Sequence, residues 1–300
     1  MATTPLTAVF SAAGRRRISH RVQYWGLVVV ARLLGLLGVD RASAFMGLAW
    51  RLFAPLNQRH ARVHGHLAAA FPEMDAATRR RLVLDMWENL GRTAAETILL
   101  PELLKEPERI TWDHLPPDTF EKARGGAIFV SLHTGNWELV SVPLAAAGLD
   151  LRAVYKPLRN PAVEQWLAER RRALYAGGLM ALDRTIAVKL KSLAKSGATL
   201  AILADLKDPT GITLDFFGRP AAATPFPALL ARRLGLPLFV GRSIRTHGAH
   251  FRLDGRWLEV PRTDDANADV ESLTRSIHAV FEEWIREHPE QWMWAHRKWL

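Results

Sequence analysis

The chain has 300 residues, an apolar fraction of 49% and a net charge of +10, which suits one large domain with a sizeable core and an anionic partner. It contains no cysteine, which excludes a disulfide framework, a thiolate metal site and a cysteine nucleophile. Its 11 tryptophans favour surfaces with one wet and one apolar side, as at a membrane interface.

The N-terminal region combines a basic segment with the most apolar run of the chain. Arg15, Arg16 and Arg17 precede residues 24–39, YWGLVVVARLLGLLGV. This run has 16 residues and contains Arg32, whereas a membrane span needs about 20 apolar residues. We therefore predict a helix that lies in a membrane interface or dips into it, with a packed core helix as the alternative. Residues 1–40 are assigned to this basic, membrane-associated region and residues 41–300 to a single α/β domain.

The remaining pattern predicts helices first and then strands alternating with helices. Helices are expected at residues 42–55, 59–71 and 76–100. Further helices are expected at residues 160–175, 187–196, 224–234 and 269–288. Strands are expected at residues 127–132, 151–155, 199–204 and 238–243, with a late hairpin over residues 250–260 around Asp254-Gly255. This alternation predicts an α/β fold with a mixed, mostly parallel sheet flanked by helices on both faces.

The chemistry is expected in residues 127–140, AIFVSLHTGNWELV. A buried strand there ends in a polar loop that opens a helix, which is where α/β proteins place reactive groups. His133 and Glu138 are five residues apart, so a loop can bring imidazole and carboxylate together and make the ring a better base. Gly135 permits a tight turn or close approach of a substrate. A buried histidine satisfied by a nearby acid is the structural alternative.

Other segments carry chemistry with a structural alternative beside each. Asp205 follows a strand, as His133 does, so it either shares the same crevice or forms a turn before Pro209. The triple cation Arg170, Arg171 and Arg172 either binds an anion or forms a solvated face. Residues 216–220, FFGRP, are expected to form a rigid loop before a helix, and Phe216 and Phe217 in it either line an acyl groove or fill the core. The aromatic and basic tail, residues 290–299, either seals the site or rests on a membrane.

The motifs together resemble the bacterial lipid A biosynthesis acyltransferases, the lauroyl/myristoyl transferase family with an H-x4-D/E motif. The resemblance runs in order through nearly the whole chain: HTGNWE at residues 133–138, AFP at 70–72, YKP at 155–157 with NP at 160–161, LDR at 182–184, FFGRP at 216–220 with Thr224, and PEQWMWAHRK at 289–298. One departure is Asp205-Leu206, where the family commonly has Asp-Gln or Asp-His, and it leaves the acceptor open.

The resemblance implies acyl transfer from an acyl carrier protein thioester, or from CoA, to a hydroxyl of a phosphorylated lipid A precursor at the cytoplasmic face of the inner membrane. His133 would be the base and Glu138 would orient it. The resemblance also implies substrate or oxyanion binding by seven residues: Gly135, Asn136, Trp137, Lys156, Arg170, Arg171 and Asp205. No metal, prosthetic group or nucleic acid is expected.

Three other functions compete with this interpretation. Another membrane lipid or glycolipid could be the acceptor, with lipid extracts of a deletion strain as the discriminating observation. A basic membrane-surface or nucleic-acid-binding protein without chemistry would keep its function in His133→Ala. A metal-dependent hydrolase would be inhibited by chelators, although the sequence has no H-E-x-x-H motif.

Overall fold

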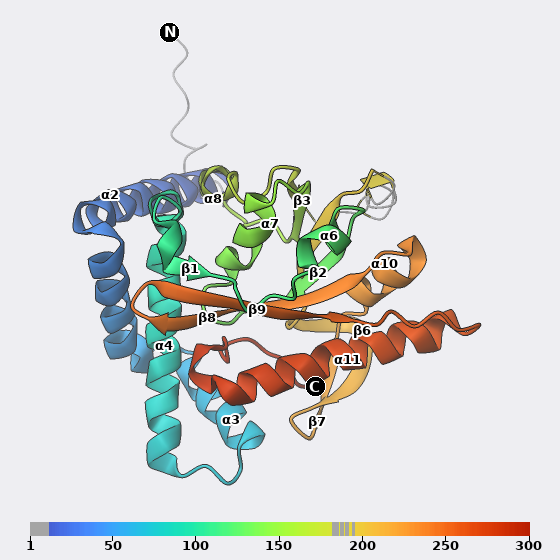
Figure 1. Cartoon of the computed structure of the whole chain (residues 1–300). Coiled ribbons are helices and arrows are strands. Elements are labelled where there is room, and N and C mark those ends of the chain that lie inside the picture. The colour runs from blue at the N-terminus through green and yellow to red at the C-terminus, as the bar shows by residue number, and fades with distance from the viewer. Residues whose placement is uncertain (1–11, 182–185, 187–188, 190–191, 194–195) are drawn as a thin grey trace.

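The computed structural model describes residues 12–300 apart from 182–185, 187–188, 190–191 and 194–195 (Figure 1). The LDR segment at residues 182–184 and much of the predicted helix at 187–196 therefore lie outside the described residues. The core is a seven-stranded sheet in the order β1-β9-β8-β2-β5-β3-β4, and β6 and β7 form a separate antiparallel pair. Every neighbouring pair in the large sheet is parallel except β8 and β9. The predicted α/β class with a mostly parallel sheet is confirmed.

The strands of the large sheet are β1 (Ile110–Thr111), β2 (Ile128–Ser131), β3 (Leu151–Tyr155), β4 (Gly178–Ala181), β5 (Thr199–Leu203), β8 (Leu238–His247) and β9 (His250–Leu258). The outer pair is β6 (Lys207–Phe216) and β7 (Arg219–Ala223). The α-helices are α2 (Ala12–Phe53), α3 (His60–Ala70), α4 (Ala76–Ile98), α5 (Leu100–Leu103), α6 (Thr119–Ala123), α7 (Val142–Ala146), α8 (Pro161–Arg171), α10 (Phe226–Leu234) and α11 (Ala266–Glu287). Short 3-10 turns are η1 (Ala54–Leu56), η2 (Pro107–Arg109), η3 (Trp137–Ser141) and η4 (Pro289–Gln291).

Strand β2 lies at the centre of the sheet and is buried on both faces. Ile128 and Val130 pack into one apolar cluster with α10 and α11, whereas Phe129 packs into a second cluster with α7 and the C-terminal part of α4. This alternation follows from the two-residue period of a strand, and it explains why the sequence there is continuously apolar. Figure 1 shows α11 across one side of the sheet and α7 and α8 on the other.

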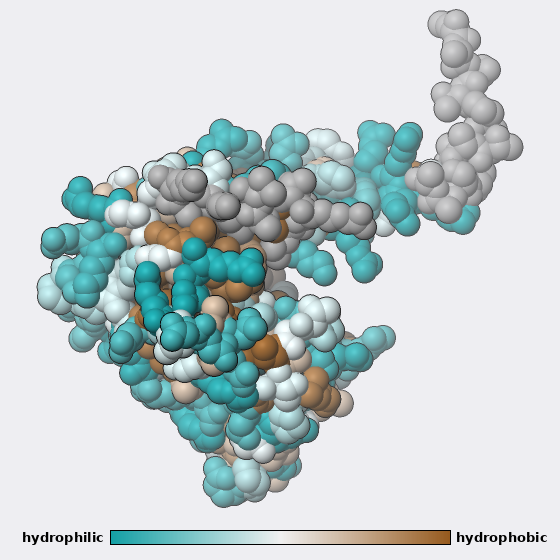
Figure 2. Space-filling view, turned by 90° about the vertical axis from the view of Figure 1, so that its right-hand side faces the viewer, coloured by the Kyte–Doolittle hydropathy of each residue, from teal (hydrophilic) through white to brown (hydrophobic). Residues whose placement is uncertain are grey.

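Helix α2 has two arms that meet at Gly38, whose φ of 74° breaks the helical geometry. Large apolar side chains are exposed along both arms: Ile18, Val22, Trp25, Val29, Leu33 and Leu36 on the first, and Phe45, Leu48 and Leu52 on the second. Their spacing of three and four residues places each set on one side of its arm. On the face shown in Figure 2, by contrast, hydrophilic residues cover most of the surface and apolar patches are small.

Two predicted elements are wrong in detail. Residues 250–260 do not form a hairpin around Asp254-Gly255, because β9 is continuous there and pairs with β8 through a turn at Gly248. Gly255 lies inside β9, and a Cβ at this position would come within 2.4 Å of the Phe239 ring, which explains the glycine there. Residues 216–220 form the β6–β7 hairpin instead of a loop, with Phe217 and Gly218 in the turn at positive φ.

Candidate active site

Two parallel neighbouring strands place His133 beside Asp205. Ser131 of β2 pairs with Leu203 of β5, so the residues two positions further along each strand, His133 and Asp205, emerge side by side at the same sheet edge. The His133 ring Nδ1 lies 2.7 Å from Asp205 Oδ1, and the His133 backbone N–H donates to Oδ2 at 3.0 Å. The crevice predicted for the two strand ends is therefore shared.

Asp205 is held as a carboxylate. It is 1% exposed, and its Oδ2 also accepts a hydrogen bond of 2.8 Å from the Trp292 indole N–H. Burial raises the pKa of Asp205, but the charge of His133 and the three hydrogen bonds outweigh burial and leave this pKa below its usual range. A carboxylate only accepts hydrogen bonds, so His133 Nδ1 carries the proton and Nε2 is the basic nitrogen. The His133 side chain is 13% exposed, which leaves the ring accessible to a substrate.

Glu138 does not hold the His133 ring, which corrects the predicted dyad. Its carboxylate lies 6% exposed and accepts two hydrogen bonds from Arg171, including one of 2.8 Å from Nε to Oε2. Burial lowers the pKa of Arg171, but the Glu138 charge outweighs it and raises that pKa. The physical reason is that Glu138 belongs to η3, which turns its side chain toward α8, while the strand end of β5 supplies the carboxylate for His133.

The three consecutive arginines of α8 separate, as expected from about 100° per residue in a helix. Arg171 faces Glu138, whereas Arg170 stacks on Trp166 at 3.1 Å and donates to the Ile98 carbonyl oxygen. Arg172 points outward and pairs with Glu169. The structure thus brings one of these cations to the motif.

The motif loop, residues 133–138, is held in place by a network of buried polar residues from α4 and β8. The Gly135 carbonyl accepts a hydrogen bond of 2.8 Å from Thr93, and Asn136 donates to Glu96 at 3.0 Å. Glu96 is 1% exposed and forms an ion pair with Arg245 of β8. Asn136 also caps η3 by accepting from the Glu138 backbone N–H.

Gly135 is required by both its conformation and its neighbours. Its φ is +55°, and a Cβ there would lie 2.2 Å from the Ser243 carbonyl oxygen. The close approach predicted at this glycine is therefore to the β8 backbone, and the glycine shapes the loop that carries His133.

The C-terminal tail closes the site from one side. The Met293 backbone N–H donates to the His133 carbonyl oxygen at 3.0 Å, and the His296 ring centroid lies 5.9 Å from that of His133. Burial, and then the charge of His133, lower the pKa of His296 to about 4. Of the two predicted roles of the tail, the structure shows it sealing the site.

Phe216 and Phe217 belong to the core beneath this tail. They are 0% and 4% exposed, and their rings pack edge-on against Trp292 and Trp294 respectively. This placement corrects the predicted acyl groove, because fully packed rings leave no wall for an acyl chain.

The remaining predicted residues are divided between the site and its rim. Trp137 packs edge-on against His133 with ring centroids 5.0 Å apart. Lys156 is exposed just after β3, at the same edge of the sheet. Within the described residues, no group of three or more His, Asp or Glu side chains could hold a metal ion.

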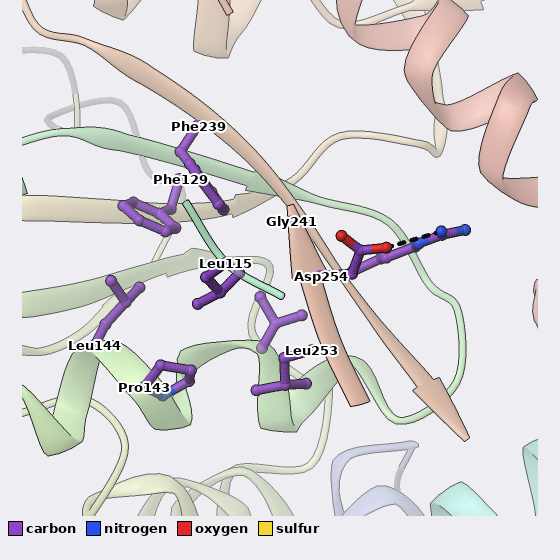
Figure 3. Close-up of a pocket in the computed structure, with 10 residues that line it drawn as sticks. Leu115, Phe129, Pro143, Leu144, Phe239, Gly241, Leu253 and Asp254 are labelled. Carbon is purple, nitrogen blue, oxygen red and sulfur yellow. Dashed lines mark hydrogen bonds and ion pairs between the residues drawn. The ribbon is translucent and has the colours of Figure 1, made fainter. Parts of the chain in front are cut away.

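An apolar hollow lies between the helix that carries Pro143 and Leu144, α7, and the strands β2, β8 and β9 (Figure 3). The side chains of Leu115, Phe129, Leu144 and Phe239 surround it, while Asp254 turns away toward Arg242, 3.0 Å distant. Its volume is 10 Å³, about one water-sized sphere, so it does not accommodate an acyl chain.

Sequence reasoning missed the partners that hold the loop, namely Glu96, Arg245 and Trp292. Glu96 lies on the buried side of α4, and Arg245 lies within a strand where a charge is costly unless paired. A charged residue inside an apolar element was the available signal, but it does not name its partner.

Comparison with known proteins identifies the family to which the chain belongs. The model of the family described as bacterial lipid A biosynthesis acyltransferase matches residues 12–300. The chain belongs to this family. It is 26% identical over 260 residues to the phosphatidylinositol mannoside acyltransferase of Mycobacterium tuberculosis H37Rv, covering 82% of this chain and 76% of that protein.

Lipid A enzymes are related to a similar degree. The chain is 26% identical over 260 residues to the lipid A biosynthesis lauroyltransferase of Escherichia coli K12, covering 81% of this chain and 79% of that protein. It is also 26% identical over 248 residues to the lipid A biosynthesis acyltransferase 2 of Shigella flexneri, covering 77% and 74%. The family resemblance predicted from the motifs is confirmed, and the protein is an acyltransferase of the lipid A or phosphatidylinositol mannoside type.

Proposed function

We propose that the protein transfers a fatty acyl chain from a thioester to a hydroxyl of a membrane glycolipid, with His133 as general base. The contact between His133 Nδ1 and Asp205 carries this proposal, because it fixes the tautomer in which Nε2 accepts a proton. The ring is also partly exposed beside an open cleft, so a hydroxyl can reach it.

The reaction proceeds by direct attack. His133 Nε2 takes the proton of the acceptor hydroxyl as its oxygen bonds to the thioester carbonyl carbon. The tetrahedral intermediate collapses, the C–S bond breaks, and the imidazolium returns the proton to the leaving thiolate. A general base of this kind contributes about 10² to 10⁴-fold to the rate.

The carboxylates of Asp205 and Glu138 have different roles in this mechanism. Asp205 positions His133 and stabilises the imidazolium. Glu138 holds Arg171 next to the motif loop, where its charge favours the oxyanion of the intermediate. Gly135, Asn136 and Trp137 shape the loop, Lys156 lies exposed at the same edge of the sheet, and Arg170 turns away toward the Ile98 carbonyl at the end of α4.

The donor and the acceptor follow from the family and the charge. We assign an acyl carrier protein thioester as donor and a phosphorylated lipid A precursor as acceptor, consistent with the net charge of +10 and the lipid A enzymes among the relatives. A phosphatidylinositol mannoside-like glycolipid is the second candidate, because relatives of equal identity carry that name. CoA is the alternative donor.

Helix α2 supports action at a membrane surface. It is long and apolar enough to cross a membrane, yet only 11% of its most apolar window is buried, which is unlike a core helix. The kink at Gly38 and the exposed apolar side chains of both arms suit a helix lying in the interface, flanked by Arg16, Arg17 and Arg21. We place this surface on the cytoplasmic side of the inner membrane.

An in vitro transfer assay tests the proposal. Wild type and His133→Ala receive acyl carrier protein and CoA thioesters of several chain lengths, with either a Kdo2-lipid A precursor or a phosphatidylinositol mannoside. We expect a product one acyl group heavier in wild type, and its loss in His133→Ala. Transfer that persists in His133→Ala would refute the base assignment, and transfer to neither glycolipid would refute the acceptor class.

A further inference from the structure

An open cleft of 420 Å³ begins beside the His133–Asp205 pair. Leu206, which lines it, directly follows Asp205 in the chain. His296, on another wall, has its ring centroid 5.9 Å from that of His133. His296 and Leu206 therefore connect the cleft to the His133–Asp205 pair.

Cations from three separate segments converge on this cleft. Arg59 and Arg62 come from the start of α3, Lys207 begins β6, and Arg297 belongs to the C-terminal tail. The residues that line the cleft include no aspartate or glutamate. Segments that are distant in sequence have thus brought four positive charges together in the cleft next to the His133–Asp205 pair.

These charges are not neutralised by the protein. Arg62 and Lys207 each donate to a neutral backbone carbonyl, of Ala295 and Trp299 respectively, both at 3.1 Å. Arg59 and Arg297 form no ion pair with any carboxylate in the described part of the chain. The exposed arginines of α11 differ, since Arg275 and Arg286 each pair with a glutamate one turn away.

The cations of the cleft influence His296, which lines the same cleft. The pKa of His296 is lowered to about 4 by burial first, then by the charge of His133, and also by the charges of Arg59 and Arg62. The ring is therefore neutral near pH 7 and adds a hydrogen-bonding group to a cationic wall. An anion is the complement that this surface lacks.

We propose that the cleft binds a phosphate group of the acceptor glycolipid and thereby presents the acceptor hydroxyl to His133. The inference rests on the proposed function and deepens it by assigning the residues that bind the acceptor phosphate. Arginine suits this ligand, because its planar guanidinium donates to phosphate oxygens in pairs.

The position of the cleft favours the acceptor over the donor. A headgroup carries its phosphate a few bonds from its hydroxyls, so one group can sit among the arginines while another reaches His133. In an acyl carrier protein or CoA thioester, the long pantetheine arm separates the phosphate from the reactive carbonyl. A donor phosphate would accordingly bind far from the dyad.

Binding measurements in nonionic detergent micelles test the proposal. The probes are a Kdo2-lipid A precursor with and without its phosphates, and a phosphatidylinositol mannoside beside a phosphate-free mannosyl diacylglycerol. Arg59→Gln/Arg297→Gln removes two exposed cleft charges. The matched control, Arg124→Gln/Arg233→Gln, removes two exposed charges elsewhere.

We expect the cleft variant to bind at least one phosphorylated lipid about tenfold more weakly, because charge-assisted hydrogen bonds are lost. Its affinity for the phosphate-free counterpart, and all affinities of the control, should stay at the wild-type values. Equal weakening in both variants, or equal weakening for both lipids of a pair, would overturn the proposal. So would a raised KM for the thioester with unchanged acceptor binding, which would assign the cleft to the donor.

The readout separates this inference from the proposed reaction. His133→Ala should bind phosphorylated acceptor as wild type does and yet transfer nothing. Loss of phosphate-dependent binding in the cleft variant, together with transfer by His133→Ala, would refute His133 as the base and support phosphate binding in the cleft. Transfer that requires His133 but does not depend on the acceptor phosphate would support the base and refute phosphate binding in the cleft.

Discussion

The motif loop, residues 133–138, and the outer face of α2 differ in how their side chains are satisfied. The loop is largely buried, and its polar groups have partners on α4, on α8, on Asp205 just after β5, and on the tail. The outer face of α2 is apolar and exposed, with Leu36 84% and Trp25 56% accessible. The difference teaches that reactive groups lie where many contacts fix their geometry. The apolar face of α2, in contrast, has no partner in the described part of the chain and is open to one outside it.

The largest effect is expected where the dyad itself is altered. Asp205→Asn keeps the shape but offers His133 Nδ1 an amide, which no longer enforces the tautomer or stabilises the imidazolium. We expect kcat to fall on the order of 10³ to 10⁴-fold, as for triad aspartates. The control is Asp208→Asn, three residues on, whose carboxylate binds Thr210 and should leave kcat unchanged.

Glu138→Gln sharpens the assignment of the two carboxylates. If Glu138 were the orienting acid, its variant would match the loss in Asp205→Asn, and the geometry described above would be refuted. We expect a smaller loss, because the His133–Asp205 contact persists while Arg171 loses its ion pair.

The loop scaffold can be broken without touching the dyad. Glu96→Gln leaves Arg245 buried without its charge partner, and removing one member of a buried pair costs about 3–5 kcal/mol in the free energy of unfolding. Denaturant unfolding measures this. Glu88→Gln, two turns earlier on α4 with a 29% exposed side chain, should change stability by under about 1 kcal/mol. Equal costs would show that Glu96 is no special anchor.

These variants show which parts of the site were predictable. The strand, the loop and the importance of His133 and Gly135 follow from local sequence, because a buried apolar run that ends in polar residues and glycine has few interpretations. The partner of His133 does not, because it depends on β2 and β5 being neighbours in register, with 72 residues between the two side chains. Spacing along the chain favoured Glu138, and strand pairing decided for Asp205.

The sequence predicted the longer helices of the fold but not all of its strands. Helices α3, α4, α8, α10 and α11 lie close to their expected ranges, since their apolar periodicity and caps are local signals. The short strands β1, β4 and β7 were missed, because two to five residues carry too little pattern. The ten-residue strand β6 was missed because Pro209 and Gly211 interrupt its strand pattern. The division at residue 40 stays a prediction, although α2 continues through it to Phe53.

The apolar face of α2 can be altered without touching the site. Trp25→Ser/Leu33→Ser/Leu36→Ser removes three exposed side chains from one stripe of the first arm. We expect partition into anionic vesicles to fall about 10- to 100-fold, since each buried apolar side chain contributes about 1.5–3 kcal/mol when fully transferred. The unfolding free energy in detergent-free buffer should barely change. Leu300→Ser, exposed outside α2, is the control, and equal partition of both variants would argue against the docking face.

The smallest expected effect concerns pH. His278 is buried, its Nε2 lies 2.9 Å from Lys298 Nζ, and burial followed by the Lys298 charge lowers the pKa of His278 to about 3. The unfolded chain protonates this ring near pH 6.5 and the folded chain does not, so stability is lost as the pH falls below about 6.5. Between pH 7 and 5.5 this costs roughly 1 kcal/mol. Urea unfolding of His278→Gln at both pH values should show a correspondingly smaller decrease, whereas exposed His114→Gln should lose as much as wild type; identical decreases in all three proteins would refute the assignment.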